Sequence, residues 1–151
     1  MTSIFVRFYE AIIRAGEAFQ DYLLLAMRLY WGFLFYQTGM GKIGNLPQIV
    51  KFFENLGIPF ANSNAHMVAY LEAGGGILLM IGLASRLVSI PLTAVLCTAY
   101  VTAHRDAVLG IFQDPENFIS QPPFNFLIMC LVVFAVGPGK FSLDYLLERK
   151  K

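Results

Sequence analysis

A carboxylate inside an apolar stretch constrains this chain more than any other feature. The stretch from His66 to Arg86 is long enough to cross a bilayer, and Glu72 lies within it, followed by three glycines. About 20 apolar residues span a hydrocarbon core of roughly 30 Å. A carboxylate at that depth costs on the order of 2–3 kcal/mol unless it faces the bundle interior or takes up a proton. Since glycines let a neighbouring backbone approach closely, we expect a tightly packed helix that carries Glu72 inward.

The composition agrees with lipid as the surrounding solvent. Hydrophobic residues make up 57% of the chain and charged residues only 14%, whereas soluble domains carry about 25% charged residues. The length of 151 residues suits a single domain that covers residues 1–151. A net charge of +1 gives no indication of a nucleic-acid partner, so the expected surroundings are the lipid bilayer.

Four apolar segments predict an all-α fold, an integral membrane four-helix bundle. The repeat of apolar residues at spacings of three and four between residues 4 and 15 predicts an N-terminal amphipathic helix along the membrane surface, with a solvated lead-in as the alternative. A short interfacial helix is expected around residues 49–56, and a short basic amphipathic helix after Ser142, its expected N-cap. The predicted spans cover residues 22–42, 66–85, 87–104 and 122–137.

The distribution of basic residues predicts the orientation of these four spans. Four spans place both termini and the turn at Arg86 on one side, which carries seven Lys and Arg residues, whereas the opposite side carries three. Because positive charge accumulates on the cytoplasmic side of a membrane, both termini are expected in the cytoplasm.

Each predicted span contributes a polar side chain to one layer near the outer boundary. At 1.5 Å per residue, four of these side chains lie about 6–9 Å below that boundary, and the others lie at its rim. Polar groups avoid lipid, so we expect this layer to turn inward and form an outward-facing cavity with aromatic walls and Glu72 at its floor. The ligand-binding residues that this layer predicts are Gln37, Lys42, Glu72, Tyr100, His104 and Asn125.

A buried cation, Arg28, lies deeper in the first span, on the same helix face as Gly32 and Gly39. Its axial distance from Glu72 is about 10 Å, which two extended side chains nearly close. Because buried opposite charges commonly pair, Arg28 and Glu72 are expected to interact, either as a structural ion pair or in proton handling.

The two histidines do not predict a metal or haem site. His66 and His104 both fall at the outer rim, but the sequence contains no HxxxH, HExxH or Cys/His cluster. No metal site is therefore expected, and no sequence signature of a bound cofactor is present.

Four motifs in order resemble the DoxX family. Residues Arg28 to Ile43, RLYWGFLFYQTGMGKI, are similar to its first-helix signature, and KFFENLGIP, Lys51 to Pro59, resembles its second element. EAGGGILLMIGLASR, Glu72 to Arg86, resembles the third element, and GPGKFSLD, Gly137 to Asp144, the ending. The resemblance covers about residues 22–147, nearly the whole chain.

The resemblance implies a four-helix protein of a bacterial or archaeal cytoplasmic membrane. Some members of that family are subunits of a thiosulfate:quinone oxidoreductase, and others are associated with redox-stress complexes. Position by position, the family's polar motif residues correspond to Arg28, Lys42, Glu72 and Arg86. The fourth helix departs from the family, because it begins QPPFNF with Asn125 where relatives often have an acidic residue.

Three functions remain as alternatives at this level. The first is a small membrane subunit of a redox system, in which the polar pocket binds a quinone and a redox partner protein supplies the electrons. The second is a non-enzymatic scaffold or assembly subunit. The third is a passage for a small molecule, which would need a homo-oligomer because four short helices leave little room for a conduit. The sequence does not decide whether the protein is an enzyme.

Overall fold

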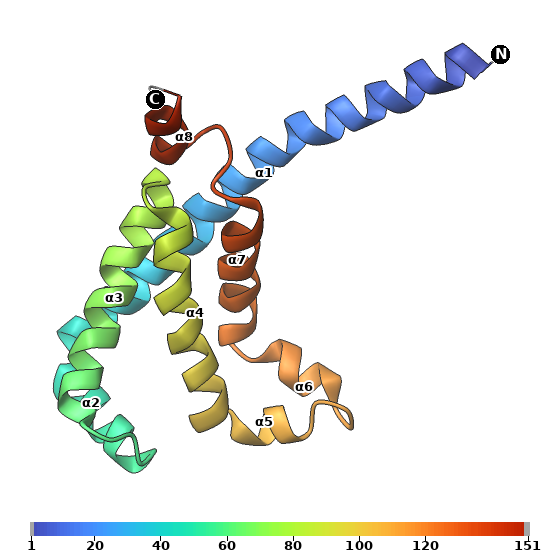
Figure 1. Ribbon diagram of the computed structural model, residues 1–151. Coiled ribbons are helices and arrows are strands. Elements are labelled where there is room, and N and C mark those ends of the chain that lie inside the picture. The colour runs from blue at the N-terminus through green and yellow to red at the C-terminus, as the bar shows by residue number, and fades with distance from the viewer. Residues whose placement is uncertain (1, 150–151) are drawn as a thin grey trace.

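The computed structural model describes residues 2–149, which form eight helices and no strand (Figure 1). The all-α prediction is therefore confirmed. The helices are α1 Thr2–Gly44, α2 Leu46–Asn55, α3 Ala61–Ile81, α4 Ser85–Thr102, α5 Arg105–Leu109, α6 Pro115–Ser120, α7 Pro123–Val136 and α8 Leu143–Glu148.

The N-terminal amphipathic helix and the first predicted span are one continuous helix, α1, of 43 residues. Its first half projects away from the other helices (Figure 1), and its apolar side chains, such as Phe5 and Phe8, are largely exposed. A separate helix along the membrane surface is therefore wrong. No proline or glycine pair interrupts residues 5–25, so nothing in the sequence ends the helix before the span begins.

Helices α1 and α3 pack closely because glycines face each other across their contact. A Cβ atom on Gly39 would lie 2.7 Å from the Cα atom of Ala73, and one on Gly32 would lie 2.9 Å from the carbonyl oxygen of Gly76. Neither position leaves room for a side chain. The predicted role of glycines in close helix packing is thus confirmed for Gly76, whereas Gly74 faces open space.

The hydrophobic core joins α1, α3, α4 and α7. Its fully buried residues interdigitate at the centre of the bundle, away from both ends, and the ring of Phe35 packs edge-on against Phe126 with ring centroids 4.6 Å apart. The core residues are Phe35, Leu79, Leu92, Leu96, Met129, Cys130 and Val133.

The connection between α4 and α7 contains two short helices rather than an extended loop. Helix α6 begins at an N-cap, since the Asp114 side chain accepts a hydrogen bond from the backbone N–H of Asn117.

The expected helix after residue 142 is α8, and Ser142 caps it by accepting from the N–H of Tyr145. The predicted N-cap is confirmed.

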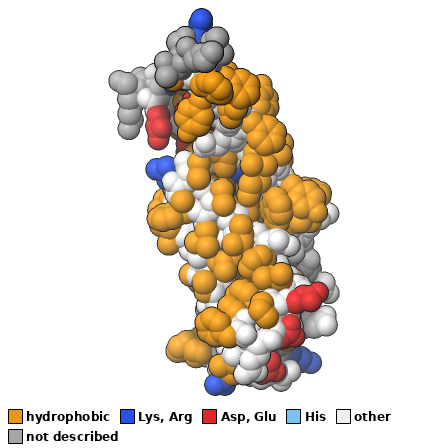
Figure 2. All heavy atoms as spheres, turned by 90° about the vertical axis from the view of Figure 1, so that its right-hand side faces the viewer, with side chains coloured by type: hydrophobic (Ala, Val, Ile, Leu, Met, Phe, Trp, Pro, Cys, Tyr) orange, Lys and Arg blue, Asp and Glu red, His pale blue; other side chains and the backbone are white. Residues whose placement is uncertain are grey.

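The distribution of charged and hydrophobic side chains agrees with the predicted membrane protein, whereas the lengths and hydropathy of the helices agree with it only in part. Figure 2 shows hydrophobic side chains over the middle of one face, with most charged side chains toward the two ends. Within the described residues, α4 is the one helix both long and apolar enough to cross a membrane, and α7 is apolar but has only 14 residues. Four membrane spans are therefore not confirmed.

A methyl group at Gly39 is expected to separate α1 from α3. Overpacking a close contact costs about 1–3 kcal/mol, so Gly39→Ala should lower the free energy of unfolding in detergent by that amount. The matched control is Gly41→Ala, since a Cβ at Gly41 meets nothing within 4 Å. That control should stabilise α1 by roughly 0.5–1 kcal/mol. Equal stability of the two variants would contradict the packing described.

Candidate functional site

A cavity of about 690 Å³ opens between α1, α2, α3 and α4, with the start of α7 behind it. It lies at the end of the molecule opposite the two termini (Figure 1). Its walls are largely apolar, as in most sites for small organic molecules. Aromatic side chains contribute to these walls: Phe35, Phe52, Phe53 and Phe126.

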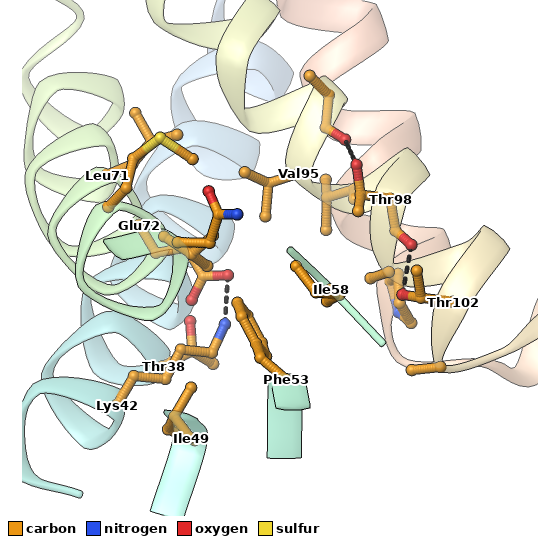
Figure 3. Close-up of a pocket in the computed structure, with 18 of the residues that line it drawn as sticks. Thr38, Lys42, Ile49, Phe53, Ile58, Leu71, Glu72, Val95, Thr98 and Thr102 are labelled. Carbon is orange, nitrogen blue, oxygen red and sulfur yellow. Dashed lines mark hydrogen bonds and ion pairs between the residues drawn. The ribbon is translucent and has the colours of Figure 1, made fainter. Parts of the chain in front are cut away.

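One ion pair lies in the wall of the cavity. The Lys42 ammonium on α1 donates a hydrogen bond of 2.5 Å to Oε1 of Glu72 on α3 (Figure 3). The Glu72 side chain is only 6% exposed, whereas that of Lys42 is 28% exposed. Burial of the carboxylate alone would be expensive, so the ammonium compensates its charge at the point where it leaves water.

The Glu72 carboxylate keeps one free oxygen. Its Oε2 atom is buried and has no hydrogen-bond partner among the protein groups around it. Buried polar atoms are nearly always hydrogen-bonded, so this carboxylate still has an acceptor position to fill. Lys42 likewise has two further N–H bonds that Glu72 does not use. The pair can thus offer both an acceptor and donors to a ligand.

The expected pairing of Arg28 with Glu72 is wrong. Arg28 is fully buried, and its Nη2 atom donates to the backbone carbonyl oxygen of Phe141 at 2.5 Å. The acidic side chain that acts on Arg28 is Asp144, not Glu72. Arg28 and Glu72 lie toward opposite ends of the bundle, and the cation that reaches Glu72 is Lys42, near the C-terminal end of α1.

Arg28 belongs to a cluster of contacts that joins residues 141–144 to the α3–α4 turn. The Asp144 carboxylate accepts from the backbone N–H groups of Ala84 and Ser85 at 2.7 and 2.9 Å, which caps the start of α4. Its own N–H donates to the carbonyl oxygen of Gly82. A side chain at Gly82 would strike Arg28, and this glycine has a φ of +70°.

A second contact fixes the same segment to α1 outside the predicted span. The backbone N–H and the side chain of Lys140 both bind the Asp21 carboxylate, at 3.0 and 2.8 Å. These hydrogen bonds hold the pKa of Asp21 below its ordinary value of 3.8. The GPGKFSLD motif therefore holds helices α1, α3 and α4 together at the end away from the cavity.

Three of the six predicted ligand-binding residues line the cavity: Lys42, Glu72 and His104. The other three do not. The side chains of Gln37 and Asn125 are exposed, and the Tyr100 hydroxyl donates to the carbonyl oxygen of Phe118, on whose ring it stacks with centroids 4.7 Å apart.

Gln37 and Asn125 do not line the cavity because of their angular position about the helix axis. Rise per residue fixes the depth of a side chain, but each step along a helix also turns it by roughly 100°. Thr38 and Lys42 are four residues apart and share the face toward the cavity, so Gln37 points away from it. In α7 the lining residue is Phe126, and its neighbour Asn125 points outward.

The sequence analysis missed several residues of the wall that carry no charge. Thr98 and Thr102 of α4 face the cavity together, as do Phe53 and Ile58 beyond α1 (Figure 3). The spacing of four between the threonines could have identified that face of α4. No group of three or more His, Cys, Asp and Glu side chains that could hold a metal ion occurs among residues 5–149.

These features define a helical protein with a single ion pair set into an apolar cavity. The family model for DoxX matches residues 23–105, which is more than half of the chain. The chain therefore belongs to the DoxX family, as the four motifs indicated.

Curated relatives are similar over most of the chain. YqjF of Escherichia coli, named an inner membrane protein, is 29% identical over 87% of this chain and 96% of its own. Rv3486 of Mycobacterium tuberculosis, named an uncharacterized membrane protein, is 28% identical over 84% of this chain and 82% of its own. CatD of Bacillus subtilis, named "Putative oxidoreductase CatD", is 27% identical over 70% of each chain. No solved structure matches the chain.

Double-mutant cycles should show which of two cations, Lys42 or Arg28, interacts with Glu72. Groups in direct contact couple by about 0.5–3 kcal/mol, whereas distant groups without shared partners add within about 0.5 kcal/mol. The free energy of unfolding should therefore show coupling for Lys42→Ala with Glu72→Ala, and additivity for Arg28→Met with Glu72→Ala. Coupling at Arg28 without coupling at Lys42 would contradict the observed pairs.

Proposed function

We propose that this protein is a membrane-embedded subunit of a redox system that binds the ring of a quinone beside Lys42 and Glu72. The observation that carries the proposal is the Lys42–Glu72 ion pair in the wall of a 690 Å³ cavity, in which one carboxylate oxygen has no partner from the protein. The relative named "Putative oxidoreductase CatD" supports the redox context. Quinone binding itself is our inference from the chemistry of the site.

The cavity supplies the two kinds of contact that a quinone ring needs. Lys42 can donate a hydrogen bond to a quinone carbonyl, and the free oxygen of Glu72 can accept one from the hydroxyl of the reduced form. The apolar walls, with Phe53 beside the ion pair in Figure 3, suit the faces of the ring. A scaffold protein would have no need of this space, since a filled interior is more stable.

The proton balance assigns a role to each member of the pair. Reduction of a quinone to a quinol consumes two electrons and two protons. The electrons would come from a redox partner protein, and each proton would pass from the Lys42 ammonium or from a protonated Glu72 to a ring oxygen. Lys42 regains protons from water because its side chain is partly exposed at the rim.

Four helices are proposed to cross the bilayer: α1 from about residue 22 onward, α3, α4 and α7. Names of relatives as membrane proteins, including an inner membrane protein, support this assignment. Both ends of the described chain lie at one end of the molecule (Figure 1), as an even number of spans requires. The seven-to-three excess of basic residues supports a cytoplasmic position for that end, and with this orientation the cavity opens toward the outer side.

Impermeant thiol labelling of intact cells should test this topology. In a background with Cys97→Ser and Cys130→Ser, a cysteine at Asn62 should react from outside because the α2–α3 end faces outward. A cysteine at Glu148 should react only after the cells are permeabilised. The reverse pattern of labelling would overturn the orientation.

Quinone binding should depend on Glu72. Loss of a hydrogen bond to a charged group costs about 1.5–3 kcal/mol, so Glu72→Gln should weaken saturable binding of a 1,4-hydroquinone, whose hydroxyl group donates to Glu72, by about tenfold or more. Glu54→Gln is the matched control, because Glu54 is an exposed carboxylate on neighbouring α2. Equilibrium binding to the purified protein in neutral-lipid nanodiscs provides the measurement.

Two results would contradict the proposal. One is the absence of saturable binding by the wild-type protein, together with no quinone in its lipid extract. The other is an equal loss of binding in the Glu72 and Glu54 variants, which would show that the effect is not local to the cavity.

A further inference from the structure

The cavity is longer than a quinone ring. Its lining on α4 runs from Pro91 to Thr102, a rise of roughly 16 Å at 1.5 Å per residue. The ion pair lies on the α1 and α3 side of this space (Figure 3). A ring held by the pair therefore leaves a large part of the α4 wall uncovered.

The uncovered part is a wedge between α3 and α4. Near their shared turn the two helices are in contact, since a Cβ on Gly75 would lie 3.1 Å from the Leu92 side chain and 3.3 Å from that of Val88. Toward their other ends they diverge (Figure 1). The side chains that line this wedge are apolar or methyl-bearing: Met67, Val68, Leu71, Ala94, Val95 and Thr98.

The hydroxyl hydrogens of three threonines in this wall already bind carbonyl oxygens of the protein itself. The hydroxyl of Thr38 donates to the Phe35 carbonyl oxygen at 2.9 Å, and that of Thr98 donates to the Ala94 carbonyl oxygen at 2.9 Å. Thr102 donates to Thr98 in the same way. These threonine hydroxyl groups therefore have no free hydrogen for a ligand, and recognition of a polar head is left to the ion pair, to Asn64, which donates one N–H to the Pro59 carbonyl oxygen, and to His104 at the rim.

The charge of the site also restricts its ligand. Lys42 and Glu72 cancel each other, and no other Lys, Arg, Asp or Glu lines the cavity. A carboxylate or phosphate head bound to Lys42 would bring a second negative charge beside the buried Glu72 carboxylate, with only one ammonium to compensate both, which is unfavourable. A neutral head that accepts from Lys42 meets the pair without breaking it, and its reduced form can also donate to Glu72.

We infer that the ligand is a neutral amphiphile with a single apolar chain, whose head binds Lys42 and Glu72 and whose chain lies in the wedge between α3 and α4. This inference rests on the proposed quinone site and adds where the chain lies and which charge the head carries. The hydrocarbon chain of the ligand is already in an apolar solvent when it lies in a bilayer. Its transfer into the wedge therefore adds little hydrophobic free energy, and the wedge determines where the hydrocarbon chain lies. The informative measurement is therefore the position of the chain.

Photocrosslinking of the full-length protein in neutral-lipid nanodiscs would locate the chain. The probe is a 1,4-benzoquinone with a ten-carbon chain that ends in a diazirine, and peptide mass spectrometry identifies its adducts. We expect adducts within residues 67–71 of α3 and 91–98 of α4. Excess benzoquinone with an unlabelled ten-carbon chain should abolish them, whereas the same concentration of decanoate, which has an anionic head, should not.

A filled wedge should block the adducts without altering the polar pair. Ala94→Trp overpacks the wedge, at a cost of about 1–3 kcal/mol to any chain there, so labelling should fall by about tenfold. Val101→Trp is the matched control, because Val101 is exposed on α4 and does not line the cavity. Labelling of that variant should equal the wild-type level.

The outcomes separate this inference from the function on which it rests. Saturable, Glu72-dependent binding with adducts outside the wedge would overturn the inference and leave the quinone site standing. Competition by decanoate equal to that by the neutral quinone would overturn the assignment of a neutral head. No saturable binding of any quinone probe would overturn both.

Discussion

The close approach of α1 to α3 is the constraint on which the rest of the structure depends. Gly39 lies against the backbone of Ala73, one residue beyond Glu72, so the end of α1 passes directly beside the carboxylate. Lys42 follows one turn later and reaches Glu72 from there. A larger residue at the contact would move the ammonium away and leave a buried, uncompensated charge, which is among the most costly defects in a fold. The same residues therefore determine both the packing of α1 on α3 and the position of the ion pair: Gly39, Lys42, Glu72 and Ala73.

Hydrogen bonds between charged side chains and backbone groups stabilise the opposite end of the bundle. There the buried guanidinium of Arg28 binds a backbone carbonyl, and Asp144 caps α4 through two backbone N–H groups. These contacts fix the α3–α4 turn and leave the far ends of both helices free to diverge. The cavity lies where that divergence is greatest, so the hydrogen bonds at one end of the molecule help to shape the space at the other.

The sequence predicts the helical class, a short helix around residues 49–56, the cap at Ser142 and the inward position of Glu72, because each depends on local pattern or on depth in an apolar segment. It does not predict which cation meets the carboxylate. Arg28 and Lys42 are both within reach along the axis, and only the crossing of α1 over α3 decides between them. Gln37 and Asn125 fail for the related reason that a rotation of one residue turns a side chain from the cavity to the surface. Periodicity relative to a known lining residue, as between Thr38 and Lys42, is the signal that would have corrected them.

Arg28 and Lys42 differ in what they can do chemically as well as in where they lie. A guanidinium stays protonated under all conditions that a folded protein survives, so Arg28 can position the end of the chain but cannot relay a proton. An ammonium and a carboxylate in contact can each lose or gain one. In the proposed function, proton exchange with a ligand would therefore fall to Lys42 and Glu72 in the cavity wall, whereas Arg28 stabilises the opposite end of the bundle.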